Sequence, residues 1–124
     1  MKLQPDRSDA QTISAHGPGW VAVGQEKITT SCVLSASGER LPWAGRFEDL
    51  GPEHFDTLAR LGVEVVIFGS GARLRFPKPA WLASLARARI GIETMDTAAA
   101  CRTYNILAQE GRNVAVALLL ERAA

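Results

Sequence analysis

The chain has 124 residues and a mass of 13.3 kDa. Of its residues, 47% are hydrophobic and 22% are charged. These values fit one domain and exclude both wholesale disorder and a second ordinary domain. The net charge of +1 argues against dedicated nucleic-acid binding, and the longest apolar run, Val114–Leu120, is far shorter than the roughly twenty residues of a membrane span.

The first half of the chain predicts antiparallel β structure after a loose segment over residues 1–11. Short strands are expected over Thr12–Ala15 and Trp20–Val23, with a glycine-rich turn between them. Lys27–Ala36 predicts a longer strand, because its residues alternate between two faces and many are β-branched. Residues 42–50 are expected to be irregular.

The second half of the chain alternates helices and strands. The predicted elements are a helix opened by Gly51-Pro52 and ended by Gly62, a strand over Val63–Phe68, a helix over Ala80–Ala88, a strand over Ile90–Glu93, a helix over Thr97–Glu110 and a strand over Val114–Leu120. Two successive βαβ units make these three strands parallel, and the last, apolar throughout, suits a central position. We expect one α/β sandwich domain over residues 12–124, in which residues 12–36 pack on or extend a parallel core.

The carboxyl ends of the parallel strands are where an open α/β sheet binds ligands. The candidate ligand-binding residues at or near these ends are Gly69, Ser70, Gly71, Arg73, Glu93, Asp96, Arg102 and Asn105. The two glycines offer a backbone that a ligand can approach closely, and Arg73 adds a cation. Arg102 and Asn105 belong to a narrow polar stripe on the otherwise apolar helix over Thr97–Glu110.

Each of these candidates also has a purely structural interpretation. The Gly69–Gly71 segment is equally typical of a tight turn, and Asp96 stands where a helix N-cap is expected. Arg102 is predicted to reach Glu93 or Asp96, either as an ion pair that holds the loop to the helix or as part of an anion-binding site.

The sequence pattern indicates no catalytic group and no metal site. No Ser/His/Asp or Cys/His arrangement follows from order or spacing, and Cys32 and Cys101 lack metal-ligand spacing. Cys101 is expected to be buried and inert. The amino terminus has no apolar segment typical of a secretory signal, so the sequence predicts a cytoplasmic protein without a disulfide.

A basic stretch without acidic residues runs from Gly69 to Ile92. Its cations are Arg73, Arg75, Lys78, Arg87 and Arg89. Phe76 and Trp81 add apolar surface nearby, which favours contact with a protein rather than with nucleic acid. The alternative is a solvated rim balanced by acidic residues elsewhere.

Two stretches resemble the signature of one family. The first, Gly91–Arg112, reads G-I-E-T-M-D-T-A-A-A-C-R-T-Y-N-I-L-A-Q-E-G-R, and the second is Gly69–Arg73 together with Phe76-Pro77. The family is catalogued as domain of unknown function 498, and its eukaryotic members include mitochondrial respiratory complex I assembly factor three. The resemblance covers roughly residues 12–120. It implies a three-layer α/β fold with a mixed sheet, no established enzymatic activity and no known cofactor.

Two functions follow as hypotheses. The leading one is a non-catalytic accessory domain that binds a protein partner during assembly of a membrane-associated, respiratory-type complex. The alternative is a protein or enzyme that binds a small anionic ligand at the carboxyl ends of the parallel strands. The sequence indicates neither the partner nor the oligomeric state.

Overall fold

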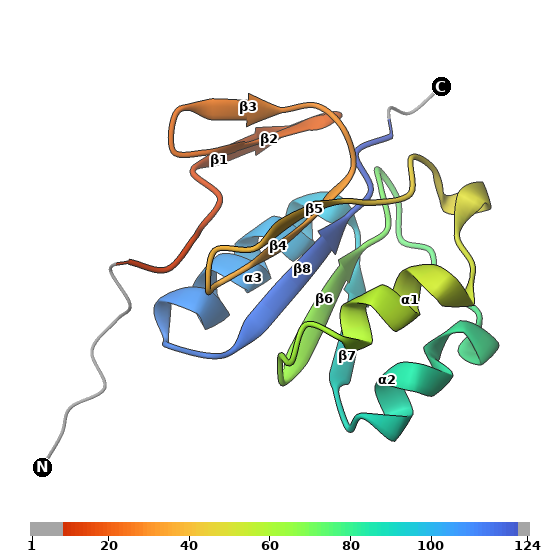
Figure 1. Cartoon of the computed structure of the whole chain (residues 1–124). Coiled ribbons are helices and arrows are strands. Elements are labelled where there is room, and N and C mark those ends of the chain that lie inside the picture. Colours follow the sequence, from red (N-terminus) through yellow and green to blue (C-terminus); the bar gives the residue numbers. More distant parts are fainter. Residues whose placement is uncertain (1–8, 122–124) are drawn as a thin grey trace, which may run out of the picture.

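The structure is a computed structural model that describes residues 9–121 (Figure 1). Its elements, in chain order, are β1 (Ala15–Gly17), β2 (Trp20–Val23), β3 (Glu26–Ile28), β4 (Cys32–Ser35), β5 (Arg40–Pro42), the 3-10 helix η1 (Phe47–Asp49), α1 (Pro52–Ala59), β6 (Val65–Gly69), the 3-10 helix η2 (Pro79–Leu82), α2 (Ala83–Arg87), β7 (Gly91–Met95), α3 (Thr97–Gln109) and β8 (Val114–Leu118). They form a three-stranded sheet in the order β1-β2-β3 and a five-stranded sheet in the order β5-β4-β8-β6-β7.

The five-stranded sheet contains the predicted parallel core. β6 pairs in parallel with β7 on one side and with β8 on the other, as right-handed βαβ crossovers require. β4 runs antiparallel to β8, and β5 runs antiparallel to β4, which makes the sheet mixed. Every residue of β8 is buried, because this central strand is covered on both faces. The predicted α/β fold class is confirmed.

The two faces of the sheet have different coverings, so the molecule has three layers (Figure 1). α1 and α2 cover one face, where β8 contributes Ala115 and Ala117. α3 and the small sheet cover the other face, where β8 contributes Val114, Val116 and Leu118. Successive strand residues point to opposite faces, so β8 presents alanines to one layer and larger side chains to the other.

An aromatic cluster fills the space that the alanines of β8 leave on the α1 side. Phe55 of α1 and Phe68 of β6 each lie edge-on to Trp43, with ring centroids 5.7 Å apart, and Phe55 stacks on Trp81 at 5.9 Å. These rings bury a large apolar area in favourable geometries. They fix η2 and the irregular segment around Trp43 against the sheet.

The prediction of a single strand over Lys27–Ala36 is wrong, because this segment forms two strands in two different sheets. β3 pairs with β2, whereas β4 pairs with β5 and β8. At the break, the buried Ser31 accepts a hydrogen bond at its Oγ from the Leu120 N–H at 2.9 Å. Ile28 and Leu34 pack in the same core, so the alternation of faces continues while the hydrogen-bond partners change.

The first strand begins at Ala15 and not at Thr12. Ile13 makes no strand pairing, because its N–H and its C=O both bond to the side-chain amide of Asn105. The structure also contains β5, which the sequence did not predict. This edge strand has only three residues and includes Pro42, a combination without a clear sequence signal.

The loose amino-terminal segment was predicted to extend through residue 11. Residues 1–8 lie outside the described part of the chain. Gln11, however, is firmly held: its N–H donates to Ala36 O at 3.1 Å, and its side-chain amide donates to the carbonyls of Ser35 and Glu39. The folded part of the chain therefore includes Gln11.

We expect neither cysteine to react with thiol reagents in the folded protein. Cys32 and Cys101 are free and buried, as predicted for Cys101. Burial raises the pKa of Cys32 to about 11 and that of Cys101 to about 12, because a low-dielectric interior disfavours the thiolate. Ellman's reagent at about pH 8 should therefore titrate both thiols only after denaturation. Rapid labelling of either thiol under native conditions would contradict this prediction.

Candidate functional site

The carboxyl ends of the three parallel strands meet at one rim, as the sequence predicted. Ser70, just after β6, donates its N–H to Met95 O at the end of β7, at 2.9 Å. Gly71 and Thr97 bond reciprocally: the Thr97 N–H donates to Gly71 O and the Gly71 N–H donates to Thr97 Oγ1, both at 2.9 Å. The loop after β6 is thereby bonded to the first residue of α3.

Thr97 joins the third strand end to the same rim. Its hydroxyl donates to Leu119 O, just after β8, at 2.8 Å. One side chain thus ties together the ends of β6 and β8 at the start of α3. Sequence reasoning missed this role, because threonine at the first position of a helix is an ordinary residue and both of its partners are distant in sequence.

Gly69 is required by packing. A Cβ at this position would lie 3.1 Å from Ala100 Cβ, Leu118 Cδ2 and Thr97 Oγ1. The absence of a side chain lets α3 approach the sheet closely.

Ser70 has a structural role in the loop after β6. It is fully buried, and its Oγ accepts the Arg75 N–H at 2.9 Å while lying 2.8 Å from Arg73 O and 3.2 Å from Met95 O. This hydroxyl shapes the loop after β6. Such a role agrees with the interpretation of the Gly69–Gly71 segment as a tight turn.

Asp96 is the N-cap of α3. Its Oδ1 accepts the Ala99 N–H at 2.9 Å, which satisfies one of the free donors at the helix start. The capping interpretation is confirmed. The cap also places a carboxylate at the end of the helix that would otherwise attract an anion.

The predicted ion pair between Arg102 and a carboxylate does not form among the described residues. Ala98, Arg102 and Ile106 recur every four residues on the exposed face of α3, so the Arg102 side chain extends into solvent. Glu93 is also exposed, on the edge strand β7. The expected clamp between Arg102 and a carboxylate is therefore corrected: Thr97, and not Arg102, holds the loop after β6 to the start of α3.

Asn105 holds the amino-terminal segment and does not face the rim. Its Oδ1 accepts the Ile13 N–H and its Nδ2 donates to Ile13 O, both at 2.8 Å. The adjacent Tyr104 is fully buried and donates its hydroxyl to Gln11 O. These two side chains fasten the segment before β1 onto α3.

Arg75 and Glu121 form an ion pair at the rim that sequence reasoning missed. Their side chains are 17% and 18% exposed, and Arg75 also donates to Ser70 O while its guanidinium lies 4.6 Å from the centre of the Phe47 ring. Glu121 Oε2 in turn accepts the Phe47 N–H at 2.9 Å. Arg75 was expected in the exposed basic stretch, but it joins the loop after β6 to η1 and to the chain after β8.

A pocket of about 280 Å³ opens at this rim. It is lined by the β1–β2 turn over residues 16–19, by Gly71 and Ala72, by the start of α3 over residues 96–98, and by Leu119 and Glu121. Of the candidate ligand-binding residues, Gly71 and Asp96 line the pocket. Arg73 and Arg102, the two cations expected at the site, do not.

Comparison with known proteins identifies the family. The family model described as protein of unknown function (DUF498/DUF598) matches residues 13–119. The chain belongs to this family.

The relatives of this DUF498 domain include named and uncharacterised proteins. NADH dehydrogenase (ubiquinone) 1 alpha subcomplex assembly factor 3 of Bos taurus is 28% identical over 120 residues, covering 94% of this chain but 65% of that protein. An uncharacterised protein of Rhodobacter capsulatus is 30% identical over 121 residues, covering 94% of this chain and 90% of its own length. The solution structure of a Mth938-like domain from Bordetella pertussis has a TM-score of 0.83 and 29% identity, covering 100% of this chain and 95% of that one.

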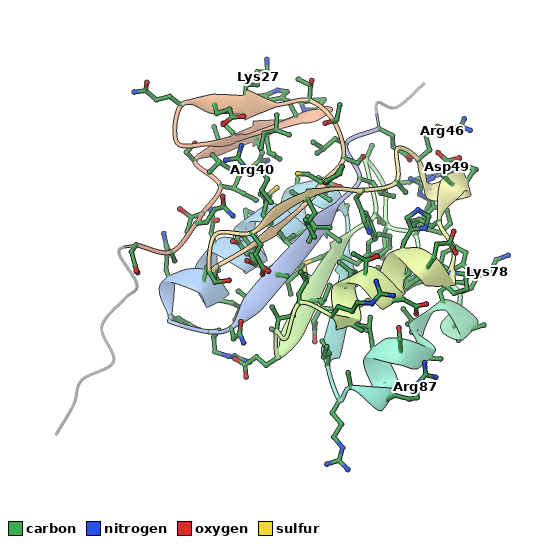
Figure 2. The ribbon with its side chains drawn as sticks, viewed as in Figure 1. Lys27, Arg40, Arg46, Asp49, Lys78 and Arg87 are labelled. Carbon is green, nitrogen blue, oxygen red and sulfur yellow. The ribbon has the colours of Figure 1, made fainter. Side chains whose placement is uncertain are left out.

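Within residues 9–121, no group of three or more His, Cys, Asp or Glu side chains is placed to hold a metal ion. Among the same residues, no helix is long and apolar enough to cross a membrane. The basic stretch does not form one exposed row, because Arg75 is paired inside the rim. Lys78 and Arg87 do point away from the ribbon (Figure 2).

Proposed function

We propose that this DUF498 domain is a non-catalytic accessory protein that binds a protein partner during assembly of a membrane-associated, respiratory-type complex. The assembly part of the proposal is supported by the relationship to the bovine protein named as an NADH dehydrogenase assembly factor. The two free cysteines are compatible with a reducing compartment, and we propose the cytoplasm.

The observation that supports partner binding is a firmly held loop that presents two large apolar side chains. Leu74 and Phe76 are 52% and 66% exposed, and they alternate with Arg75, which is paired with Glu121, and with Pro77, which is buried. Fixing the loop in advance lowers the entropy lost on binding, and exposed apolar side chains of this size are typical anchors of protein interfaces.

The charges around the loop define the partner that it fits. Arg73 and Lys78 are exposed on either side of Leu74 and Phe76. The partner surface is therefore an apolar groove with acidic residues along its edge, because opposite charges at an interface rim favour association and correct orientation.

The test is genetic complementation with variants of the loop. In a strain that lacks the gene, assembled NADH dehydrogenase is measured by native gel electrophoresis with in-gel NADH oxidation. The wild-type gene should restore the complex, whereas the double variant Leu74→Ser/Phe76→Ser should not, because the loss of two interface anchors weakens binding by roughly 30-fold or more. Both side chains are exposed, so the variant should remain folded.

Ile106→Ser provides the matched control. Ile106 is 56% exposed on α3, so the substitution removes one large exposed apolar side chain away from the loop, and the variant should restore the complex fully. Normal levels of the complex in the deletion strain would contradict the assembly role. Full restoration by the double variant would instead contradict the role of the loop.

A further inference from the structure

We propose that the pocket at the rim binds a small molecule composed of an apolar body and an amine. The pocket lies between the β1–β2 turn and the start of α3, at the carboxyl ends of the three parallel strands. Such strand ends are the usual position of ligand sites in α/β sheets. Partner binding through Leu74 and Phe76 does not require this pocket, because neither residue lines it.

The walls of the pocket determine the body of the ligand. Pro18, Ala72, Ala98 and Leu119 supply apolar surface from four separate segments of the chain. The volume of about 280 Å³ is close to the lower end, roughly 300 Å³, of the range of small-molecule pockets. A ring or short chain of six to eight heavy atoms has a suitable size.

The charges that line the pocket select an amine. Asp96 and Glu121 are the charged side chains in the lining. Glu121 is neutralised by Arg75 and has both of its oxygens engaged. Asp96 uses its Oδ1 to accept the Ala99 N–H in the helix cap. Its Oδ2 has no hydrogen-bond partner among the described residues and is available to accept a hydrogen bond from an amine. His16 of the β1–β2 turn adds an imidazole to the same lining.

An anionic ligand, which the sequence suggested, is disfavoured by the same geometry. A helix start attracts anions through its free N–H groups. At the start of α3, however, the Thr97 N–H donates to Gly71 O and the Ala99 N–H donates to Asp96. The Asp96 carboxylate therefore already occupies the place of an anion, and Arg73 and Arg102 lie outside the lining.

The test uses three probes with the same body and different charges: cyclohexylamine, cyclohexanol and cyclohexanecarboxylate. Each is titrated into the ¹⁵N-labelled full-length chain near neutral pH, and amide shifts are recorded. Cyclohexylamine should shift the amides of Gly19, Gly71 and Ala98 in a saturable manner, with an affinity about tenfold above that of the carboxylate. The proposal is overturned if the amine fails to shift these amides at about 10 mM or if the carboxylate binds equally well.

Two variants test the assignment of the site. Asp96→Asn keeps a good N-cap but removes the charge, so the affinity for cyclohexylamine should fall about tenfold while that for cyclohexanol stays the same. The matched control is Glu93→Gln, which removes an exposed carboxylate outside the pocket and should change neither affinity. Ala98→Phe should fill the pocket and abolish both interactions. Unchanged amine binding in Asp96→Asn or in Ala98→Phe would overturn the proposal.

Discussion

Replacing Arg75 with methionine is expected to lower the free energy of unfolding by about 2–3 kcal/mol. Methionine keeps much of the apolar stem but leaves Glu121, which is 18% exposed, without its cation. It also removes the donors to Ser70 O and the guanidinium over the Phe47 ring. The partial exposure of the pair places the effect below that of a fully buried ion pair. The melting temperature should fall by roughly 10 °C.

Arg73→Met is the matched control, two residues earlier in the same loop. Arg73 is exposed, so its replacement should change the stability by less than about 0.5 kcal/mol. Adding Glu121→Gln to Arg75→Met should recover about 1 kcal/mol, because the unpaired charge is then removed. Denaturant unfolding of the four proteins measures these differences. Equal losses in Arg73→Met and Arg75→Met would show that the ion pair does not anchor the loop.

The parallel core could be predicted because its signals are local. The helices and strands of the second half carry their own apolar periodicity and their own start or stop residues, such as Pro52 for α1 and Asp96 for α3. The handedness of the crossovers then fixes the strand directions. The shared rim of strand ends followed from the same reasoning.

The amino-terminal half could not be predicted equally well, because its strand boundaries depend on distant partners. β3 and β4 read as one strand in sequence, but Ser31 between them bonds to Leu120, 89 positions away. The position of β1 depends in the same way on Asn105, 92 positions from Ile13. Periodicity carries information about which face is buried and none about which strand supplies the hydrogen bonds.

The candidate site shows the same limit at the level of single arginines. Arg102 was singled out because it interrupts an apolar helix, yet it lies on the exposed face of α3. Arg75 had no distinguishing pattern, yet it is paired with Glu121, 46 positions later. The strand-end rule located the pocket, and Gly71 and Asp96 line it. The pairing of the remaining polar side chains depended on tertiary contacts that spacing does not encode.

Replacing Asn105 with alanine is expected to destabilise the protein by about 3 kcal/mol. The substitution removes two hydrogen bonds of 2.8 Å and leaves the N–H and C=O of Ile13 without their partners. Ile13 is 4% exposed, so water cannot readily replace the amide, and each unsatisfied buried group costs about 1–3 kcal/mol. Thermal and urea unfolding measure the loss.

Gln109→Ala is the matched control for Asn105→Ala, since Gln109 lies one turn further along α3 and is exposed. It should change the stability by less than about 0.5 kcal/mol. Hydrogen exchange distinguishes the mechanism: in Asn105→Ala, the amides of β1, β2 and β3 should exchange faster while those of β6 and β8 remain protected, because the lost bonds fasten only the amino-terminal segment to α3. Uniformly faster exchange throughout the domain would contradict a local tether.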